Sequence, residues 1–111
     1  MSRRIEKVNK LIQHLMAEII EREIDLKTGV LITVSQVDTT PDMRYTRVFV
    51  SVLPPRESQY VMKTLEHEIY PLQRALNKKL HMRILPRVSF VIDDREEKAN
   101  QVEQLFKEIE K

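Results

Sequence analysis

The chain has 111 residues and is nearly balanced in charge, with 19 Lys or Arg and 17 Asp or Glu. Its length predicts one domain over residues 1–111, and its 41% hydrophobic and 32% charged residues are typical of globular proteins. The lack of cysteine excludes a disulfide framework and thiolate catalysis. No apolar run approaches the roughly 20 residues of a bilayer span, and the first residues carry no secretion signal, so we expect a cytoplasmic protein that engages no membrane.

The first predicted element is a helix over residues 3–24, where apolar residues recur at spacings of three and four. At about 100° per residue, several basic residues gather within an arc of about 60°, roughly opposite the apolar stripe. The members of this arc are Arg3, Lys7, Lys10 and His14. Such an arc is often only a solvated face, but between residues 3 and 14 this one holds no acid, which favours contact with a polyanion.

Two strands follow the helix. After a turn at residues 25–29, where Gly29 either closes the helix with a positive φ or lies in the loop, β-branched residues predict a strand over residues 30–37. Alternating apolar residues predict a second strand over residues 44–53. The short polar connection at residues 38–43 predicts that the two strands form an antiparallel hairpin.

A second helical pattern covers residues 57–69 and resumes until residue 80. Pro71 interrupts it, because a proline inside a helix removes a hydrogen bond and clashes with the carbonyl four residues back. We therefore predict either one kinked helix or two helices joined at Tyr70–Pro71.

The last predicted elements are a third strand over residues 83–92 and a final helix. Pro86 breaks the alternation of the strand, which indicates an edge position or a bulge. Asp94 and Glu97 have the spacing of a capping box. The apolar stripe of the final helix is Val102, Leu105, Phe106 and Ile109. The order α-β-β-α-kink-α-β-α predicts an α+β protein with a three-stranded sheet.

No catalytic cluster emerges from the sequence. His14, His67 and His81 lack cysteine partners and the spacing of metal ligands. Asp93 and Asp94 are adjacent, so they point in different directions, and a helix cap explains Asp94 better than a Mg²⁺ pair does. We expect no enzymatic activity, no metal, no cofactor and no small-molecule substrate.

The charge pattern points instead to a nucleic acid. Residues 69–92 hold no acid, although the whole chain is nearly neutral. Tyr45, Tyr60 and Tyr70 can stack on bases, but each also fits as a residue at the rim of the core. The candidate RNA-binding residues are Arg3, Arg4, Lys7, Lys10, Arg47, Arg74, Lys78, Lys79, His81, Arg83 and Arg87.

Four segments, spread over nearly the whole chain, carry a family resemblance. They are RIEKVNK (4–10) with AEII (17–20), ITVSQVD (32–38), PDMRYTRVFVS (41–51) and RILPRVSF (83–90) with Asp93. None is diagnostic alone. In this order and at these spacings they resemble bacterial ribosome-binding factor A, a biogenesis protein of the small ribosomal subunit.

The resemblance implies a type II KH-like fold, α-β-β-α-kink-α-β, with the helices on one face of the sheet, and the sequence pattern adds a C-terminal helix. The single glycine agrees with that family's lack of the GxxG loop of other KH domains. The family usually has an Ala-x-Gly kink between its second and third helices. Here the aligned residues are Glu68-Ile69-Tyr70, followed by Pro71, so we expect proline to provide the kink.

The resemblance also implies a function. The protein is expected to be a monomer that binds the immature small (30S) subunit and its 16S rRNA, and assists late maturation and 5′-end processing, with a link to cold adaptation. The main rival is a general regulator that binds single-stranded RNA, which would need aromatic residues on an open sheet or a GxxG loop. A membrane-surface protein and a small enzyme fit the sequence less well, because the first helix lacks Trp and Phe and no catalytic cluster is present.

Overall fold

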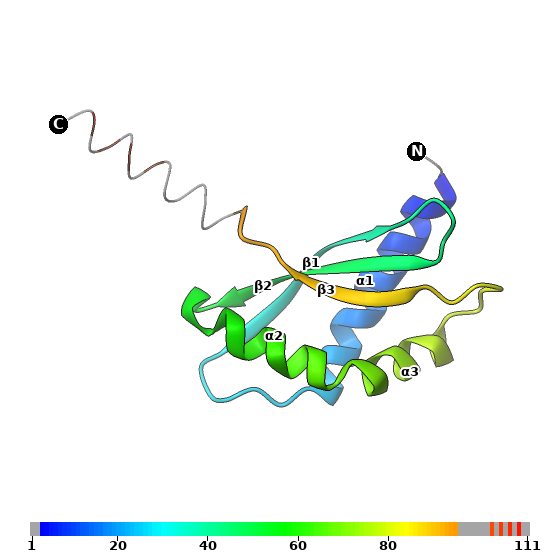
Figure 1. The fold of residues 1–111 in the computed structure, drawn as a ribbon, viewed down its shortest axis with the longest axis horizontal. Helices are drawn as coiled ribbons and strands as arrows, with labels where there is room; N and C mark the ends of the chain where they lie inside the picture. Colours follow the sequence, from blue (N-terminus) through cyan, green and yellow to red (C-terminus); the bar gives the residue numbers. More distant parts are fainter. Residues whose placement is uncertain (1–2, 96–102, 104, 106, 108, 110–111) are drawn as a thin grey trace.

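The computed structural model describes residues 3–95 and, beyond them, residues 103, 105, 107 and 109. The order of the described elements confirms the α+β prediction (Figure 1). They are α1 (Arg3–Glu23), β1 (Leu31–Thr39), β2 (Tyr45–Leu53), the short 3-10 helix η1 (Pro55–Glu57), α2 (Ser58–His67), α3 (Ile69–Lys79) and β3 (Arg87–Ile92). The predicted final helix, with its capping box and apolar stripe, lies for the most part outside the described residues.

The three strands form one sheet in the order β1-β2-β3. β1 and β2 are antiparallel, which confirms the predicted hairpin, and β3 runs parallel to β2. The register shifts between Val34 and Gln36, so β1 carries a bulge at Ser35. Gly29 lies in the loop before β1 with a φ of +88°, a value that residues with a side chain rarely adopt.

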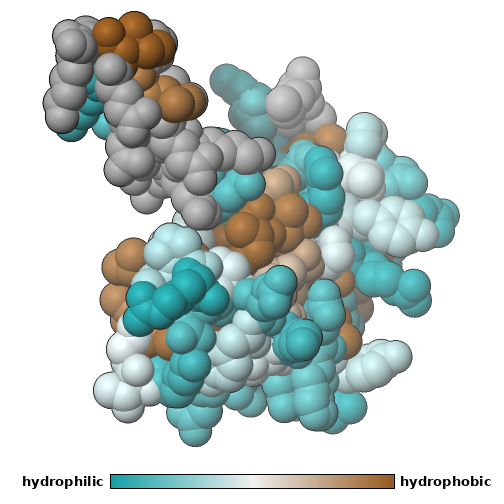
Figure 2. Space-filling model, turned by 60° about the vertical axis from the view of Figure 1, so that its left-hand side comes forward, coloured by the Kyte–Doolittle hydropathy of each residue, from teal (hydrophilic) through white to brown (hydrophobic). Residues whose placement is uncertain are grey.

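One face of the sheet packs against the helices and forms the core. In β2, the alternate residues Thr46, Val48, Val50 and Val52 are buried, as their spacing predicts. α1 packs against β1, while α2 packs against β2 and β3, so the helices cover this face (Figure 1). Because the apolar faces of the helices and strands are buried in the core, the surface seen in Figure 2 is mainly hydrophilic, with a smaller apolar patch.

The predicted interruption of the second helical run is confirmed, but it lies at Glu68 rather than at Tyr70–Pro71. Glu68 has a φ of −97° and a ψ of 16°, and Pro71 is already inside α3. Pro71 offers no N–H to the carbonyl of His67, four residues back, and its ring crowds that carbonyl. The proline therefore ends α2 one turn upstream, while it occupies a position at the start of α3 whose N–H would have no helical partner anyway.

The third strand is shorter than the sequence predicts, because β3 begins at Arg87 and not at residue 83. Pro86 is fully buried and cannot donate to a sheet ladder. The first hydrogen bond between this strand and the chain beside it is made by the N–H of Arg87, which donates to the carbonyl of Arg44 at 2.9 Å. Arg83 therefore lies in the connection before β3 and not on the strand, while the predicted edge position of this strand is correct.

Candidate nucleic-acid interface

The side chains predicted to bind RNA are all on the surface. Each of the eleven is exposed, and they come from α1, β2, α3, the α3–β3 connection and the first residue of β3. Those of α3 are exposed because Leu72 and Leu76 turn the opposite side of the helix into the core, where both are fully buried. The fold thus presents the acid-free segment to solvent.

The clearest concentration of charge lies between two helices. The side chains of α1 and α3 there line an open hollow of about 300 Å³, which we call the α1–α3 hollow. Its lining residues are Arg22, Glu23, Pro71, Arg74, Ala75, Lys78 and Lys79. Four cations and one carboxylate leave a formal charge of +3 in one concave site, a suitable arrangement for holding phosphate groups.

Arg22 is the member of the hollow that the sequence did not reveal. It lies outside the basic arc of α1, close to the acids Glu21 and Glu23, and its Nε is 3.6 Å from Glu23 Oε1. Only the packing of α1 against α3 brings Arg22 beside Arg74 and Lys78. A helical projection of α1 alone holds no signal that could have found it.

A second basic group gathers at one end of the molecule. The start of α1, the β1–β2 turn and the α3–β3 connection lie on the same side in Figure 1. The first turn of α1 carries Arg3 and Arg4, the α3–β3 connection carries Arg83, and β3 begins with Arg87. His81 lies in the same connection, and all five side chains are exposed.

The structure separates the start of the basic arc from the α1–α3 hollow. At a rise of 1.5 Å per residue, Arg3 and Arg22 are about 28 Å apart along α1. Lys7 and Lys10 lie between them on the same helix. Lys78 and Lys79 line the hollow and also form the last turn of α3, next to the α3–β3 connection, so they join the two basic groups.

The charge of Arg47 is already paired within the protein. It lies on the sheet face opposite α1 and α2, where its guanidinium is 2.6 Å from Asp38 Oδ2 on the neighbouring strand. It also lies 5.5 Å from the ring centroid of Phe49. RNA would have to compete with both contacts to bind this side chain.

The three tyrosines have different surroundings. Tyr60 is a structural residue, because its hydroxyl accepts a hydrogen bond from the N–H of Lys27 at 3.1 Å and its ring lies 4.9 Å from Lys27 Nζ. Tyr45 and Tyr70 are exposed by 55% and 79%. Tyr70 immediately precedes Pro71, which lines the α1–α3 hollow.

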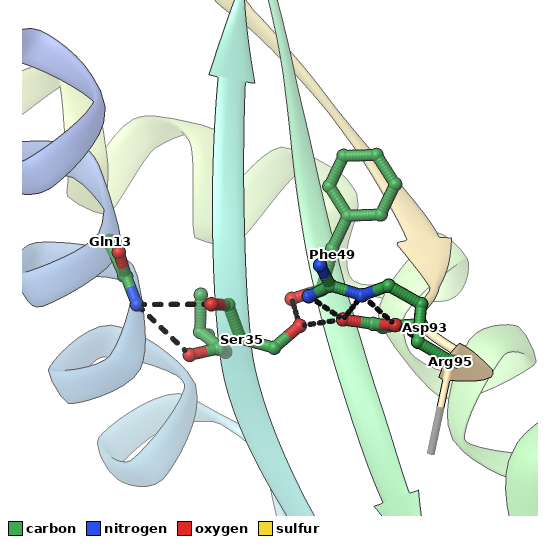
Figure 3. A network of polar contacts seen from close by, with 6 residues as sticks. Gln13, Ser35, Phe49, Asp93 and Arg95 are labelled. Carbon is green, nitrogen blue, oxygen red and sulfur yellow. Dashed lines mark hydrogen bonds and ion pairs between the residues drawn. The ribbon is translucent and has the colours of Figure 1, made fainter. Parts of the chain in front are cut away.

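A network of polar contacts joins α1, β1 and the end of β3 (Figure 3). The Ser35 hydroxyl donates to Asp93 Oδ2 at 2.6 Å, and Gln13 Nε2 lies 3.4 Å from the carbonyl oxygen of Ser35. Arg95 donates to both oxygens of the Asp93 carboxylate, from Nε at 2.9 Å and from Nη2 at 2.7 Å. The Arg95 guanidinium, and after it the Ser35 hydroxyl, hold the pKa of Asp93 well below its usual range. Asp93 is thus a structural residue that ties β1 to the end of β3.

Within residues 3–95 and the four described positions beyond them, no three His, Cys, Asp or Glu side chains gather as a metal site requires. His14 lies 3.2 Å from Glu18 Oε1, one helical turn away. None of the described helices combines the length and the apolar character that crossing a bilayer requires.

Comparison with known proteins decides the family. The family model described as ribosome-binding factor A matches residues 4–106. The chain belongs to the ribosome-binding factor A family. Ribosome-binding factor A of Pelodictyon phaeoclathratiforme is 33% identical over 100% of this chain and 95% of its own length. That of Chlorobium phaeobacteroides is 35% identical over 100% of this chain and 97% of its own length.

Solved structures of ribosome-binding factor A share the fold. The crystal structure of the Thermus thermophilus protein matches with a TM-score of 0.71 and 26% identity, covering 79% of this chain and 94% of that one. A homology model of the Thermus thermophilus protein, fitted into a cryo-EM map of its complex with the 30S subunit, matches with a TM-score of 0.65 and 25% identity, covering 78% of this chain and 91% of that one. The α+β, KH-like prediction is therefore confirmed.

Two segments that carry the resemblance to ribosome-binding factor A meet in space. Ser35 belongs to the segment 32–38, and Asp93 closes the segment that starts at residue 83. Their hydrogen bond joins residues 58 positions apart. The role of Asp93 is therefore structural, because its hydrogen bond holds the end of β3 against the bulge of β1.

Proposed function

We propose that this protein is a ribosome biogenesis factor that binds the immature small (30S) ribosomal subunit through its 16S rRNA. The observation that carries the proposal is membership of the ribosome-binding factor A family. A relative of the same fold is described in complex with the 30S subunit. The protein works in the cytoplasm as a monomer and acts by binding, without catalysing a reaction.

The basic surface supplies the affinity in this proposal. Arg22, Arg74 and the two lysines at the end of α3 hold phosphates in and beside the α1–α3 hollow. Arg83 and Arg87 extend the contact along the RNA backbone. Phosphate contacts carry little sequence information, so the shape of the folded rRNA and neighbouring ribosomal proteins provide the specificity.

The bound protein assists late maturation of the subunit, including processing at the 5′ end of 16S rRNA, and it matters most in the cold. RNA helices and misfolded RNA contacts are more stable at low temperature, so a subunit that must rearrange gains more from a protein that stabilises the correct fold.

Deletion of the gene tests the proposal. A strain without the protein is expected to accumulate 16S rRNA with an unprocessed 5′ end, more at low than at optimal temperature, as measured by primer extension. A plasmid copy of the wild-type gene restores the mature end, while a copy with Arg74→Gln and Lys78→Gln does not. Normal 16S rRNA ends in the deletion strain in the cold contradict the proposal. Recovery of messenger RNA in place of small subunits with the tagged protein favours the general RNA regulator.

A further inference from the structure

Tyr70 is a large aromatic side chain that the fold leaves without a partner. It is 79% exposed, and within the part of the chain that the structure describes it makes no hydrogen bond, ion pair or ring contact. Tyr60, by contrast, is held by contacts with Lys27. The core does not need the ring of Tyr70, so the ring is accessible to a ligand.

The backbone around Tyr70 is held firmly. On one side Ile69 packs against the core, and on the other Leu72 is fully buried. The N–H of Leu72 also donates to the carbonyl of Glu68 at 3.1 Å. Pro71 fixes its own φ, so the first turn of α3 has few alternative conformations. Binding of a ligand to a ring on such a backbone therefore costs little backbone entropy.

Tyr70 stands in line with the cations of the α1–α3 hollow. Tyr70, Arg74 and Lys78 are each four residues apart on α3, so they are neighbours along one stripe of the helix surface. Successive members are about 6 Å apart along the axis. Arg74 and Lys78 line the hollow, as does Pro71 next to Tyr70. The stripe therefore presents an aromatic ring followed by two cations.

We propose that Tyr70 is a stacking platform for one unpaired RNA base, with Arg74 and Lys78 holding the phosphates of the adjoining nucleotides. Proteins that bind single-stranded nucleic acid combine aromatic side chains, on which bases stack, with a positively charged groove that follows the backbone. Arg22 reaches the same phosphates from α1. The inference rests on the proposed function, because it assumes that RNA occupies the hollow, and it adds that the RNA there is single-stranded.

The test separates stacking from charge by measuring Kd for purified free small subunits over a range of salt concentrations. Tyr70→Ala is expected to weaken binding by about 5- to 150-fold at every salt concentration, because this is the contribution to affinity of one base stacked on an aromatic ring. The slope of log affinity against log salt stays unchanged, because no phosphate contact is lost. Tyr70→Phe keeps the ring and binds like the wild type. Leu53→Ala, the control, removes another large exposed side chain at the opposite end of β2 from the partner of Arg87, and changes binding little.

The possible outcomes distinguish this inference from the proposed function. If the wild-type protein binds no small subunits, both fail. If the wild type binds and Tyr70→Ala binds within about twofold of it, only the stacking inference fails. A loss for Tyr70→Phe as large as that for Tyr70→Ala also overturns it, because the hydroxyl and not the ring would then make the contact. If Tyr70→Ala weakens binding to subunits but not to protein-free 16S rRNA, the ring contacts a ribosomal protein and the inference is wrong.

Discussion

Removing two positive charges from the α1–α3 hollow should weaken binding to the small subunit. The size of the loss can be worked out from the counterions that RNA releases when the protein binds its phosphates. The double variant Arg74→Gln, Lys78→Gln changes two exposed residues of α3, and glutamine forms helices about as well as arginine and lysine do. The buried side chains Leu72 and Leu76, which hold α3 on the core, are unchanged. Each lost phosphate contact lowers the slope of log affinity against log salt by about 0.7 for single-stranded and about 0.9 for duplex nucleic acid. Two contacts therefore flatten the slope by about 1.4 to 1.8, which amounts to about 25- to 60-fold weaker binding at 0.1 M salt.

The assay is a titration of labelled protein with purified free small subunits at several salt concentrations. If about five phosphates are neutralised in total, the wild-type slope is about −3.5 to −4.5. The control variant carries Arg56→Gln and Lys63→Gln, which remove the same charge from exposed residues of η1 and α2. In both variants the free energy of unfolding should differ from that of the wild type by no more than about 0.5 kcal/mol per substitution. Equal slopes for the two double variants refute the assignment of the hollow to phosphate.

Further expectations concern the kink, the Ser35–Asp93 network and the core. Pro71→Ala restores an N–H that can bond to the carbonyl of His67, so an NMR structure of the variant should show α2 and α3 closer to one continuous helix. The variant should bind small subunits more weakly, while its melting temperature changes little. Ser35→Ala should lower the free energy of unfolding in urea by about 1–3 kcal/mol, because it removes a hydrogen bond to a carboxylate, and should leave subunit binding unchanged. The lowered pKa of Asp93 contributes stability that is complete above the unfolded value of about 3.9 and is lost as the pH falls below it. Asp93→Asn should therefore be less stable than wild type at pH 7 in urea unfolding, with a difference that narrows below about pH 4; a constant difference contradicts this. Leu72→Ala, at a fully buried position, should cost about 2–5 kcal/mol by the same method, and a loss below 1 kcal/mol shows that α3 does not pack as described.

Local patterns in the sequence predicted the elements and the faces that they bury. The alternation of Thr46, Val48 and Val50 predicts which side of β2 faces the core, because side chains of a strand alternate regardless of the partner. Boundaries were less accurate where proline acts at a distance. The effect of Pro71 reaches back to Glu68 because the clash is with the carbonyl of an earlier turn, and Pro86 delays the start of β3 because it cannot donate to the ladder.

The site could be predicted only in part. Exposure of Arg74 and Lys78 follows from the spacing of the leucines on α3. The part played by Arg22 depends on where α1 crosses α3, and the role of Asp93 depends on a partner 58 residues earlier in the chain. Such contacts depend on tertiary packing, and no local pattern encodes them. The resemblance to ribosome-binding factor A identified the family from the order of four segments, and the matching residues 4–106 confirm it.

Co-sedimentation in a sucrose gradient tests the central claim most directly. Cell extract containing the tagged protein is separated into free small subunits, free large subunits and translating ribosomes, and each fraction is probed for the tag. The protein is expected in the fraction of free small subunits, because that is where immature 30S particles migrate. The Arg74→Gln, Lys78→Gln variant should shift to the top of the gradient, while the Arg56→Gln, Lys63→Gln control stays with the subunits. Equal occupancy of translating ribosomes, or absence of the wild-type protein from the small-subunit fraction, would contradict the account.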